Sequence, residues 1–377
     1  MYRKLENRII EYRRQLHKIP ELGFELPKTR AFLLSVLAPL GFEIRDLGKA
    51  GFTAYFDNNK KQTIAFRSDM DAIPIQESGA CSFASVHEGV MHACGHDGHM
   101  SILLGLAILI AENPEKSAYN CLLVFEAAEE TTGGAKLICD TGILKDYGVL
   151  CIYGLHLWPY SPLHTIVCRP GEFMAGTYVI EVTAKGRSAH IAEYQESADA
   201  LEAGCKFIMR AYELERTLPP EKFRILRFGE IVSGTANNII SGKTYMAGAV
   251  RAFDDDTFSY FLTGLEKIMR ELETETGVAF TFEKSDGYPP VINPPDLYAQ
   301  TKATLTNADF EWHTPEYPTM HAEDFVFYQR EVPGLFMHLG TGAGVLLHSP
   351  EYKLDEMALL TGTRLFWTLL TTAKEWE

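Results

Sequence analysis

Side chains that bind metals are concentrated in residues 91–100, which read MHACGHDGHM. Cys94 and His96 stand on either side of a glycine, so a thiolate and an imidazole can turn toward one cation. A lone Cys-Gly-His also occurs by chance, and the histidines of one short loop rarely all reach one centre. We therefore take His96 as a candidate ligand, and His92 and His99 as non-ligands.

The two adjacent carboxylates, Glu129 and Glu130, can take different roles at a metal site. One can bind a cation while the other accepts a proton from water. The glycines at 133–134 suit a tight turn, and a helix beginning there would add a positive field. A pair of glutamates at a helix start is also a common, purely structural arrangement. The pair therefore indicates a metal or catalytic site only if other candidate groups lie near it.

Further candidate groups follow other apolar runs. Asp71 ends the run in "RSDMDAIP", His156 lies in "GLHLWP" and His348 in "LLHSPEY". Taken singly, each has a structural explanation: a lone histidine is usually a surface or core residue, and an aspartate before Pro74 suits a turn. Their joint arrival at the ends of predicted strands favours a metal site.

The elements that must position these groups alternate along the first part of the chain. Strand-like runs begin at Thr63, Asn120 and Val149, with helical patterns between them, the first expected over 101–111. This alternation predicts an α/β fold with a mostly parallel central sheet. Ligand sites gather outside the carboxyl ends of such strands, so the candidate groups should converge on one cleft.

The pattern changes near residue 172. From there to about 286 the order is strand-helix-strand-strand-helix-strand, typical of a ferredoxin-like α+β domain. We therefore predict a catalytic domain of residues 1–172 and 287–377, interrupted by a small inserted domain of residues 173–286.

Composition narrows the function classes. The chain has 377 residues, 46% hydrophobic and 23% charged, with a formal net charge of −15. Nucleic acid and anionic membranes bind basic patches, whereas this chain is acidic overall, so neither is an expected partner.

The N-terminal segment and the cysteines bear on location. Residues 1–23 predict an amphipathic helix rather than a signal peptide. The apolar run 102–111 is too short to span a membrane. Seven scattered cysteines show no disulfide framework, so a reducing cytoplasm is the expected location.

The chain resembles, along nearly its full length, the amidohydrolases of the aminoacylase-like metallopeptidase superfamily. This subgroup includes hippurate hydrolases, bacterial aminoacylases, auxin-conjugate hydrolases and N-acetyldiaminopimelate deacetylases. The resemblance implies a two-metal catalytic domain and an inserted lid that also dimerises. It rests on ordered motifs: RRQLHKIPELGFE, FRSDMDAIP, MHACGHDGHM, AAEETTGGA, GLHLWP, GRSAH, GTANNIISG, GAVRAF, EDFVFY followed by VPGLFMHLG, and LHSPEY.

The resemblance also implies roles in the catalytic domain. Glu129 matches the general base, and Asp71 the carboxylate that orients a ligand. Cys94 is placed to bridge two divalent ions, for which zinc or manganese is favoured and cobalt or nickel remains open. The implied metal ligands are Cys94, His96, Glu130, His156 and His348.

In the lid, the resemblance implies three residues. His190 matches a histidine that reaches the active site of the partner subunit of a homodimer and helps hold the oxyanion. Asn238 and Arg251 resemble residues that contact substrate, the arginine being suited to a carboxylate.

The chain departs from the family pattern at three places. Glu126 stands in "FEAAEE" where Gln-Pro usually precedes Ala-Glu-Glu. Tyr194-Gln195 stands where a Pro-His pair often follows the lid histidine, and Ser241 replaces a proline after "NNII". These positions are expected to flank the substrate pocket or the lid.

The resulting hypothesis is hydrolysis of the amide bond of an N-acyl amino acid, including N-acetyl-diaminopimelate. A dipeptidase or carboxypeptidase on the same scaffold is the alternative within enzymes. A non-catalytic metal-dependent binding protein is disfavoured by the complete set of candidate ligands. A redox role for Cys94 is disfavoured because no second cysteine is near it in the sequence.

Overall fold

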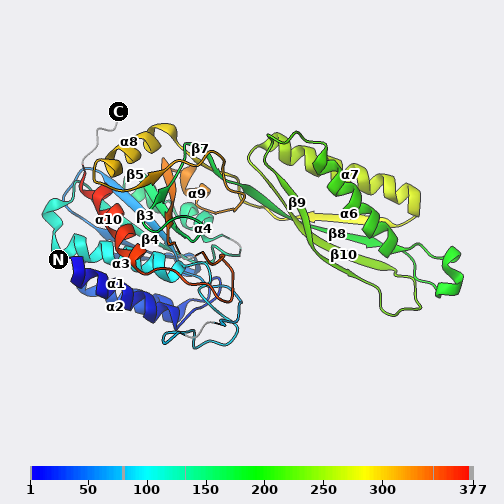
Figure 1. Cartoon of the computed structure of the whole chain (residues 1–377), viewed down its shortest axis with the longest axis horizontal. Coiled ribbons are helices and arrows are strands. Elements are labelled where there is room, and N and C mark those ends of the chain that lie inside the picture. The colour runs from blue at the N-terminus through cyan, green and yellow to red at the C-terminus, as the bar shows by residue number, and fades with distance from the viewer. Residues whose placement is uncertain (1, 79–80, 132, 343, 373–377) are drawn as a thin grey trace. The chain divides into compact units, whose positions relative to one another are not determined.

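The computed structural model describes residues 2–78, 81–131, 133–342 and 344–372 (Figure 1). The chain divides into two compact units. Unit 1 comprises Met1–Phe173, Ile292–Tyr317 and Asp324–Glu377, and unit 2 comprises Met174–Val291 and Pro318–Glu323.

Unit 1 is built on a mixed sheet whose centre is parallel. Its order across the described residues is β1-β2-β4-β3-β5-β14-β6-β13. The neighbours β4, β3, β5 and β14 are parallel, whereas β1 and β2 add antiparallel pairs at one side. The expected α/β fold is thus confirmed. The strands are β1 (Glu43–Asp46), β2 (Gly51–Phe56), β3 (Thr63–Asp69), β4 (Asn120–Glu126), β5 (Val149–Trp158), β6 (Ile166–Val167), β13 (Trp312–His313) and β14 (Gly334–Gly340).

Helix α3 (His96–Glu112) lies at the centre of unit 1. Its residues from His96 to Ile110 are all buried, because α1 and α10 pack on it and it packs on β3 and β5. A Cβ at Gly105 would approach Ile9 Cδ1 and Thr363 Oγ1 to 2.7 Å, so glycine permits this close packing. The other helices are α1 (Tyr2–His17), α2 (Pro27–Leu37), α4 (Gly134–Asp140), α5 (Ile143–Asp146), α8 (Pro295–Thr306), α9 (Val326–Gln329) and α10 (Met357–Thr371).

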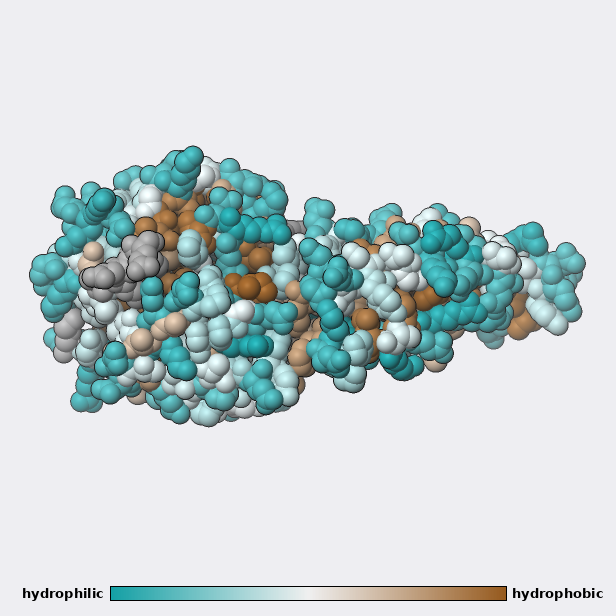
Figure 2. Space-filling view, turned by 90° about the horizontal axis from the view of Figure 1, so that it is seen from above, coloured by the Kyte–Doolittle hydropathy of each residue, from teal (hydrophilic) through white to brown (hydrophobic). Residues whose placement is uncertain are grey.

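The apolar run 102–111 is therefore a core helix, as its length predicts. A helix that is hydrophobic all round has to be buried on every side. Among the described helices, none combines the length and apolarity needed to cross a bilayer. Figure 2 shows hydrophilic residues over most of the face in view.

Unit 2 is a four-stranded antiparallel sheet with two helices on it (Figure 1). Along the chain the order is β8 (Gly176–Lys185), α6 (Ala200–Arg216), β9 (Ile225–Ser233), β10 (Lys243–Ala252), α7 (Asp255–Thr276) and β11 (Ala279–Lys284). In space the order is β11-β8-β10-β9. Ile180, Val182 and Ala184 alternate along β8 and are fully buried beneath the helices. This is the ferredoxin-like connectivity.

Unit 2 begins after Phe173 and its main segment ends at Val291, where the predicted bounds were 172 and 286, and one further segment differs. Residues 318–323 were expected in the catalytic domain but belong to unit 2. The backbone N–H of Ala175 donates to Thr319 O and His321 O at 3.2 and 2.9 Å, and Arg251 Nη1 donates to Met320 O at 2.6 Å. These contacts join residues that are far apart in the sequence, so no local sequence pattern could predict them. The short strands β7 (Gly171–Met174) and β12 (Val291–Asn293) pair with each other where the chain passes between the units.

Candidate dinuclear metal site

The carboxyl ends of three neighbouring parallel strands carry the candidate groups. Asp69 ends β3, Glu129 and Glu130 follow β4, and His156 lies near the end of β5. The strands are ordered β4-β3-β5, so their ends share one edge of the sheet. This adjacency brings together residues that are far apart in the sequence.

The Cys-Gly-His segment joins this edge at the start of α3. The helix begins at His96 rather than at residue 101. The prediction was wrong here because the first turn is polar and shows no apolar periodicity. Gly95 has φ of 89°, a left-handed conformation suited to glycine, and a Cβ there would meet Tyr352 Oη at 2.7 Å. This turn places Cys94 before the helix and His96 within it.

Two groups of potential ligand atoms share Cys94. One contains Cys94, His96 and His156, and the other contains Cys94, Glu130 and His348. Within each group the ligand atoms lie within 4.8 Å of one another. Cys94 Sγ is 3.3 Å from His156 Nε2, and His348 Nε2 is 3.1 Å from Glu130 Oε1.

The ring of His96 is oriented so that one nitrogen is available to a cation. Its Nδ1 lies 2.8 Å from the carbonyl oxygen of Asp71, which a donated proton satisfies. Its Nε2 is buried and has no hydrogen-bond partner among the described residues. That nitrogen lies 3.7 Å from Asp69, 3.9 Å from Glu129 and 3.8 Å from Glu130.

The field at the site favours positive charge. Burial lowers the pKa of His96, but Asp69, Asp71 and Glu130 together raise it to about 10. Burial raises the pKa of the Cys94 thiol well above its ordinary value, and Glu130 adds to the effect. A bound cation reverses this balance by favouring the thiolate. The buried, unpartnered Nε2 and the mixed thiol, imidazole and carboxylate donors fit a divalent metal.

Asp71 holds the adjacent glutamates in place. Its carboxylate accepts the backbone N–H groups of Glu129 and Glu130 at 3.1 and 3.2 Å. Burial raises the pKa of Asp71. The same residue contacts His96, so it links the loop after β3 to the Glu-Glu loop and to α3.

The other two histidines of residues 91–100 differ in their surroundings. Asp69, His96 and His99 also lie within ligand distance of one another. However, His99 Nδ1 lies 2.7 Å from Asp69 Oδ1, and His99 Nε2 accepts the Leu157 N–H at 2.9 Å. Both nitrogens are thus engaged. Neither ring nitrogen of His92 has a hydrogen-bond partner within the described part of the chain.

In unit 2 the structure brings His190 and Asn238 together and leaves Arg251 apart. The Ile191 N–H donates to Asn238 O at 3.0 Å, and the side chains of His190 and Asn238 are exposed. His190 Nδ1 accepts the Ala192 N–H at 3.2 Å. Arg251 lies at the other end of β10, paired with Thr177. A ten-residue strand such as β10 spans roughly 30 Å.

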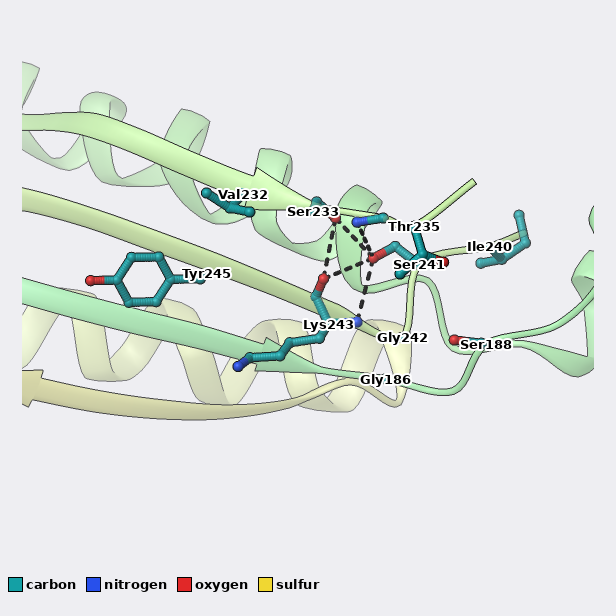
Figure 3. Close-up of a pocket in the computed structure, with 11 residues that line it drawn as sticks. Gly186, Ser188, Val232, Ser233, Thr235, Ile240, Ser241, Gly242, Lys243 and Tyr245 are labelled. Carbon is teal, nitrogen blue, oxygen red and sulfur yellow. Dashed lines mark hydrogen bonds between the residues drawn. The ribbon is translucent and has the colours of Figure 1, made fainter. Parts of the chain in front are cut away.

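Two of the departures from the family pattern have structural roles. Glu126 is fully buried, and it accepts from Arg67 Nε at 2.7 Å and from Tyr328 Oη at 2.8 Å. Ser241 lines a cavity of about 470 Å³ in unit 2, and Figure 3 shows the hydrogen bonds around its hydroxyl. Its hydroxyl accepts from Gly234 N–H at 3.1 Å and donates to Lys243 O at 2.8 Å. Tyr194 and Gln195 lie in a short 3-10 segment, Ile191–Glu196, and are exposed.

Sequence reasoning missed a buried cluster around Arg67. This arginine is 2% exposed and also contacts Asp69 at 2.8 Å and Asp324 at 2.9 Å. The signal was a charged residue inside an apolar strand, which requires buried partners. Asp324 stands in the quoted "EDFVFY" motif but had no assigned role.

Comparison with known proteins decides the family. The model of "Peptidase family M20/M25/M40" matches residues 65–372. The chain belongs to this family. This M20 chain is a hydrolase, and it is similar to proteins named as a putative amidohydrolase of Bacillus subtilis and as N-acetyldiaminopimelate deacetylases.

Individual relatives of the M20 chain align over most of their length. An N-acetyldiaminopimelate deacetylase of Streptococcus uberis is 33% identical over 358 residues, covering 93% of this chain and 95% of that protein. One of Listeria monocytogenes is 32% identical over 357 residues, covering 94% and 96%. The solved structure of the Bacillus subtilis YXEP protein, described as a dinuclear metal binding peptidase from the M20 family, has a TM-score of 0.83 at 28% identity and covers 98% of each chain.

Proposed function

We propose that this M20 hydrolase cleaves the amide bond of an N-acyl amino acid, with N-acetyl-diaminopimelate as a leading candidate. The observation that carries the proposal is the pair of ligand groups sharing Cys94, with Glu129 beside them. The relatives named N-acetyldiaminopimelate deacetylase support the substrate class.

The proposal includes two divalent ions, held by Cys94, His96, Glu130, His156 and His348. When bound, such ions lower the pKa of a water and polarise the scissile carbonyl. A thiolate with imidazoles suits zinc, while manganese, cobalt and nickel also fit such donors.

Glu129 is the proposed general base. Its backbone is fixed by Asp71, and its Oε2 lies 3.9 Å from the available nitrogen of His96. The side chain is 10% exposed, so it faces the site rather than bulk water. In this role the carboxylate takes the proton of the attacking water and delivers it to the leaving amine.

His190 is the proposed donor to the oxyanion. Because its Nδ1 accepts the Ala192 N–H, the ring proton belongs on Nε2, where it can be donated. Such a donor is worth about 2.7–4 kcal/mol of barrier in comparable sites. Asn238 lies beside His190, and both are proposed to contact substrate.

The separation within unit 2 supports a homodimer with shared sites. Arg251, proposed to bind the substrate carboxylate, lies at one end of β10, while His190 and Asn238 lie beyond the other. A distance of roughly 30 Å along that strand is too long for one small substrate. We therefore assign His190 and Asn238 to the site of a partner subunit.

The edge of the unit 2 sheet supplies a surface for that dimer. Strand β9 is an outer strand, and Ile231 and Val232 near its end are 46% and 57% exposed. Unpaired edge strands pair readily with another chain, and homodimers commonly form around a two-fold axis.

We place the enzyme in the cytoplasm, because buried thiols such as those of Cys121 and Cys168 suit a reducing compartment.

One experiment tests the reaction class. Metal content is measured alongside hydrolysis of N-acetyl amino acids and of dipeptides, with and without chelator. We expect N-acetyl amino acids to be cleaved in a chelator-sensitive way. Preferential cleavage of dipeptides would assign a dipeptidase or carboxypeptidase instead, and metal binding without any turnover would assign a binding role.

The matched variant is Glu129→Gln. It keeps the size of the side chain and removes its basicity, so we expect bound metal to be retained and turnover to fall by about 10²–10⁴-fold. Full activity in Glu129→Gln would exclude this residue as the base.

A further inference from the structure

His99 is buried between a carboxylate and a backbone amide. It is 2% exposed, its Nδ1 lies 2.7 Å from Asp69 Oδ1, and its Nε2 lies 2.9 Å from the nitrogen of Leu157. The other oxygen of Asp69 accepts from Arg67 at 2.8 Å. The ring is therefore held at both nitrogens.

The partners fix the tautomer of His99. A backbone N–H can only donate, so Nε2 must be the unprotonated acceptor of the Leu157 amide. The ring proton is then on Nδ1, where the Asp69 carboxylate accepts it. His99 has no lone pair left for a metal.

The amide that His99 holds belongs to the residue after His156. The carbonyl of that same Leu157 accepts from His156 Nδ1 at 2.8 Å. His156 therefore keeps its proton on Nδ1 and presents an unprotonated Nε2, 3.3 Å from Cys94 Sγ. The rings of His99 and His156 also meet edge to face, with centroids 4.7 Å apart.

We propose that His99 is a positioning residue for the metal site. By accepting the Leu157 N–H it fixes the end of β5, and through it the orientation and tautomer of His156. The inference rests on the proposed assignment of His156 as a metal ligand, and it adds a residue outside the proposed ligand set. Hydrogen-bond partners that orient a ligand typically change metal affinity by about 10–100-fold.

Two substitutions separate the two ends of the ring. In His99→Asn the side-chain amide reaches the Nδ1 position and can still donate to Asp69, but nothing accepts the Leu157 N–H. In His99→Gln the longer side chain brings its amide oxygen to the Nε2 position, where it can accept that N–H. The positioning role therefore predicts that glutamine rescues the site and asparagine does not.

The test is calorimetric titration of Zn²⁺ into the metal-free, full-length protein. We expect His99→Asn to bind the ion held by His156 roughly tenfold or more weakly, and His99→Gln to remain within about threefold of the parent. His92→Asn is the matched control from the same loop, and it should retain the parent's Zn²⁺ affinity. Thermal unfolding of each metal-free variant shows whether the fold is intact.

The outcomes are decisive in both directions. Equal Zn²⁺ affinities for His99→Asn and His99→Gln would overturn the inference, as would loss of folding in both, since His99 would then have a purely structural role. His156→Ala distinguishes this from a failure of the proposed function. If His156→Ala binds Zn²⁺ as the parent does, the proposed ligand set is wrong as well.

Discussion

Replacing the buried Arg67 by methionine should destabilise the protein more than any exchange of a surface arginine. Arg67 donates to Glu126, Asp69 and Asp324 at 2.7, 2.8 and 2.9 Å. The three carboxylate side chains are at most 1% exposed. Methionine fills much of the volume but leaves these buried charges without their shared cation.

The magnitude follows from that geometry. Removing one partner of a buried ion pair costs about 3–5 kcal/mol, and Arg67 serves three acceptors, so the upper part of that range applies. At about 2–4 °C per kcal/mol for a large domain, the melting temperature should fall by roughly 10 °C or more. Scanning calorimetry on the metal-free protein measures this without any contribution from bound ions.

The matched control is Arg45→Met. Arg45 Nη1 lies 2.8 Å from Asp146 Oδ2, the same distance as between Arg67 and Asp69, but its side chain is 42% exposed. Water screens this surface pair, so the same substitution should change the melting temperature little. Similar losses in the two variants would refute the reasoning that burial makes the Arg67 cluster costly to break.

The pH dependence gives a second check. Burial alone would raise the pKa of Asp69, but His96, His99 and Arg67 hold it well below its ordinary value. In Arg67→Met this pKa rises, so the folded variant binds more protons than the folded parent. By linkage, the stability deficit of the variant is largest at neutral pH and above, and shrinks as the pH falls. A deficit that grows toward acid pH would contradict this account.

Three further outcomes are expected. Cys94→Ser should lower the affinity for both ions together, because Cys94 belongs to both ligand groups. A calorimetric titration that still shows two tight sites would exclude the bridging role. Mixed dimers of one His190→Ala subunit and one Glu129→Gln subunit should regain activity at about half of their sites, because one of the two sites then combines an intact Glu129 with an intact His190. Absence of any recovered activity in a subunit-mixing assay would argue against sites shared between subunits. Ser241→Ala should lower the free energy of unfolding by about 1–3 kcal/mol, because buried groups lose their hydrogen-bond partner, and it should leave the Zn²⁺ stoichiometry measured by elemental analysis unchanged.

Much of the fold and of the candidate site was predictable because local patterns carry it. Apolar runs beginning at Thr63, Asn120 and Val149 predicted parallel strands, and the polar residues at their ends then had to meet at one edge. Glu129, Glu130 and His156 could be grouped on this basis without knowledge of any long-range contact.

Other features depend on contacts that no local pattern encodes. Asp324 reaches Arg67 across 257 residues of sequence, and residues 318–323 join unit 2 through similarly remote hydrogen bonds. The beginning of α3 at His96 was missed because a polar first turn lacks the periodicity of an amphipathic helix.

The sequence by itself determined which chemistry gathers at the strand ends, because the order of residues along parallel strands fixes which side chains share an edge. It could suggest, but not establish, which histidine of residues 91–100 serves a metal. The tertiary structure decided which ring nitrogens are engaged: the Leu157 amide and Asp69 occupy both nitrogens of His99, whereas His96 Nε2 faces three carboxylates. Availability of a lone pair depends on partners brought in by folding, and the partners of His99 lie on β3 and β5, far from α3 in the sequence.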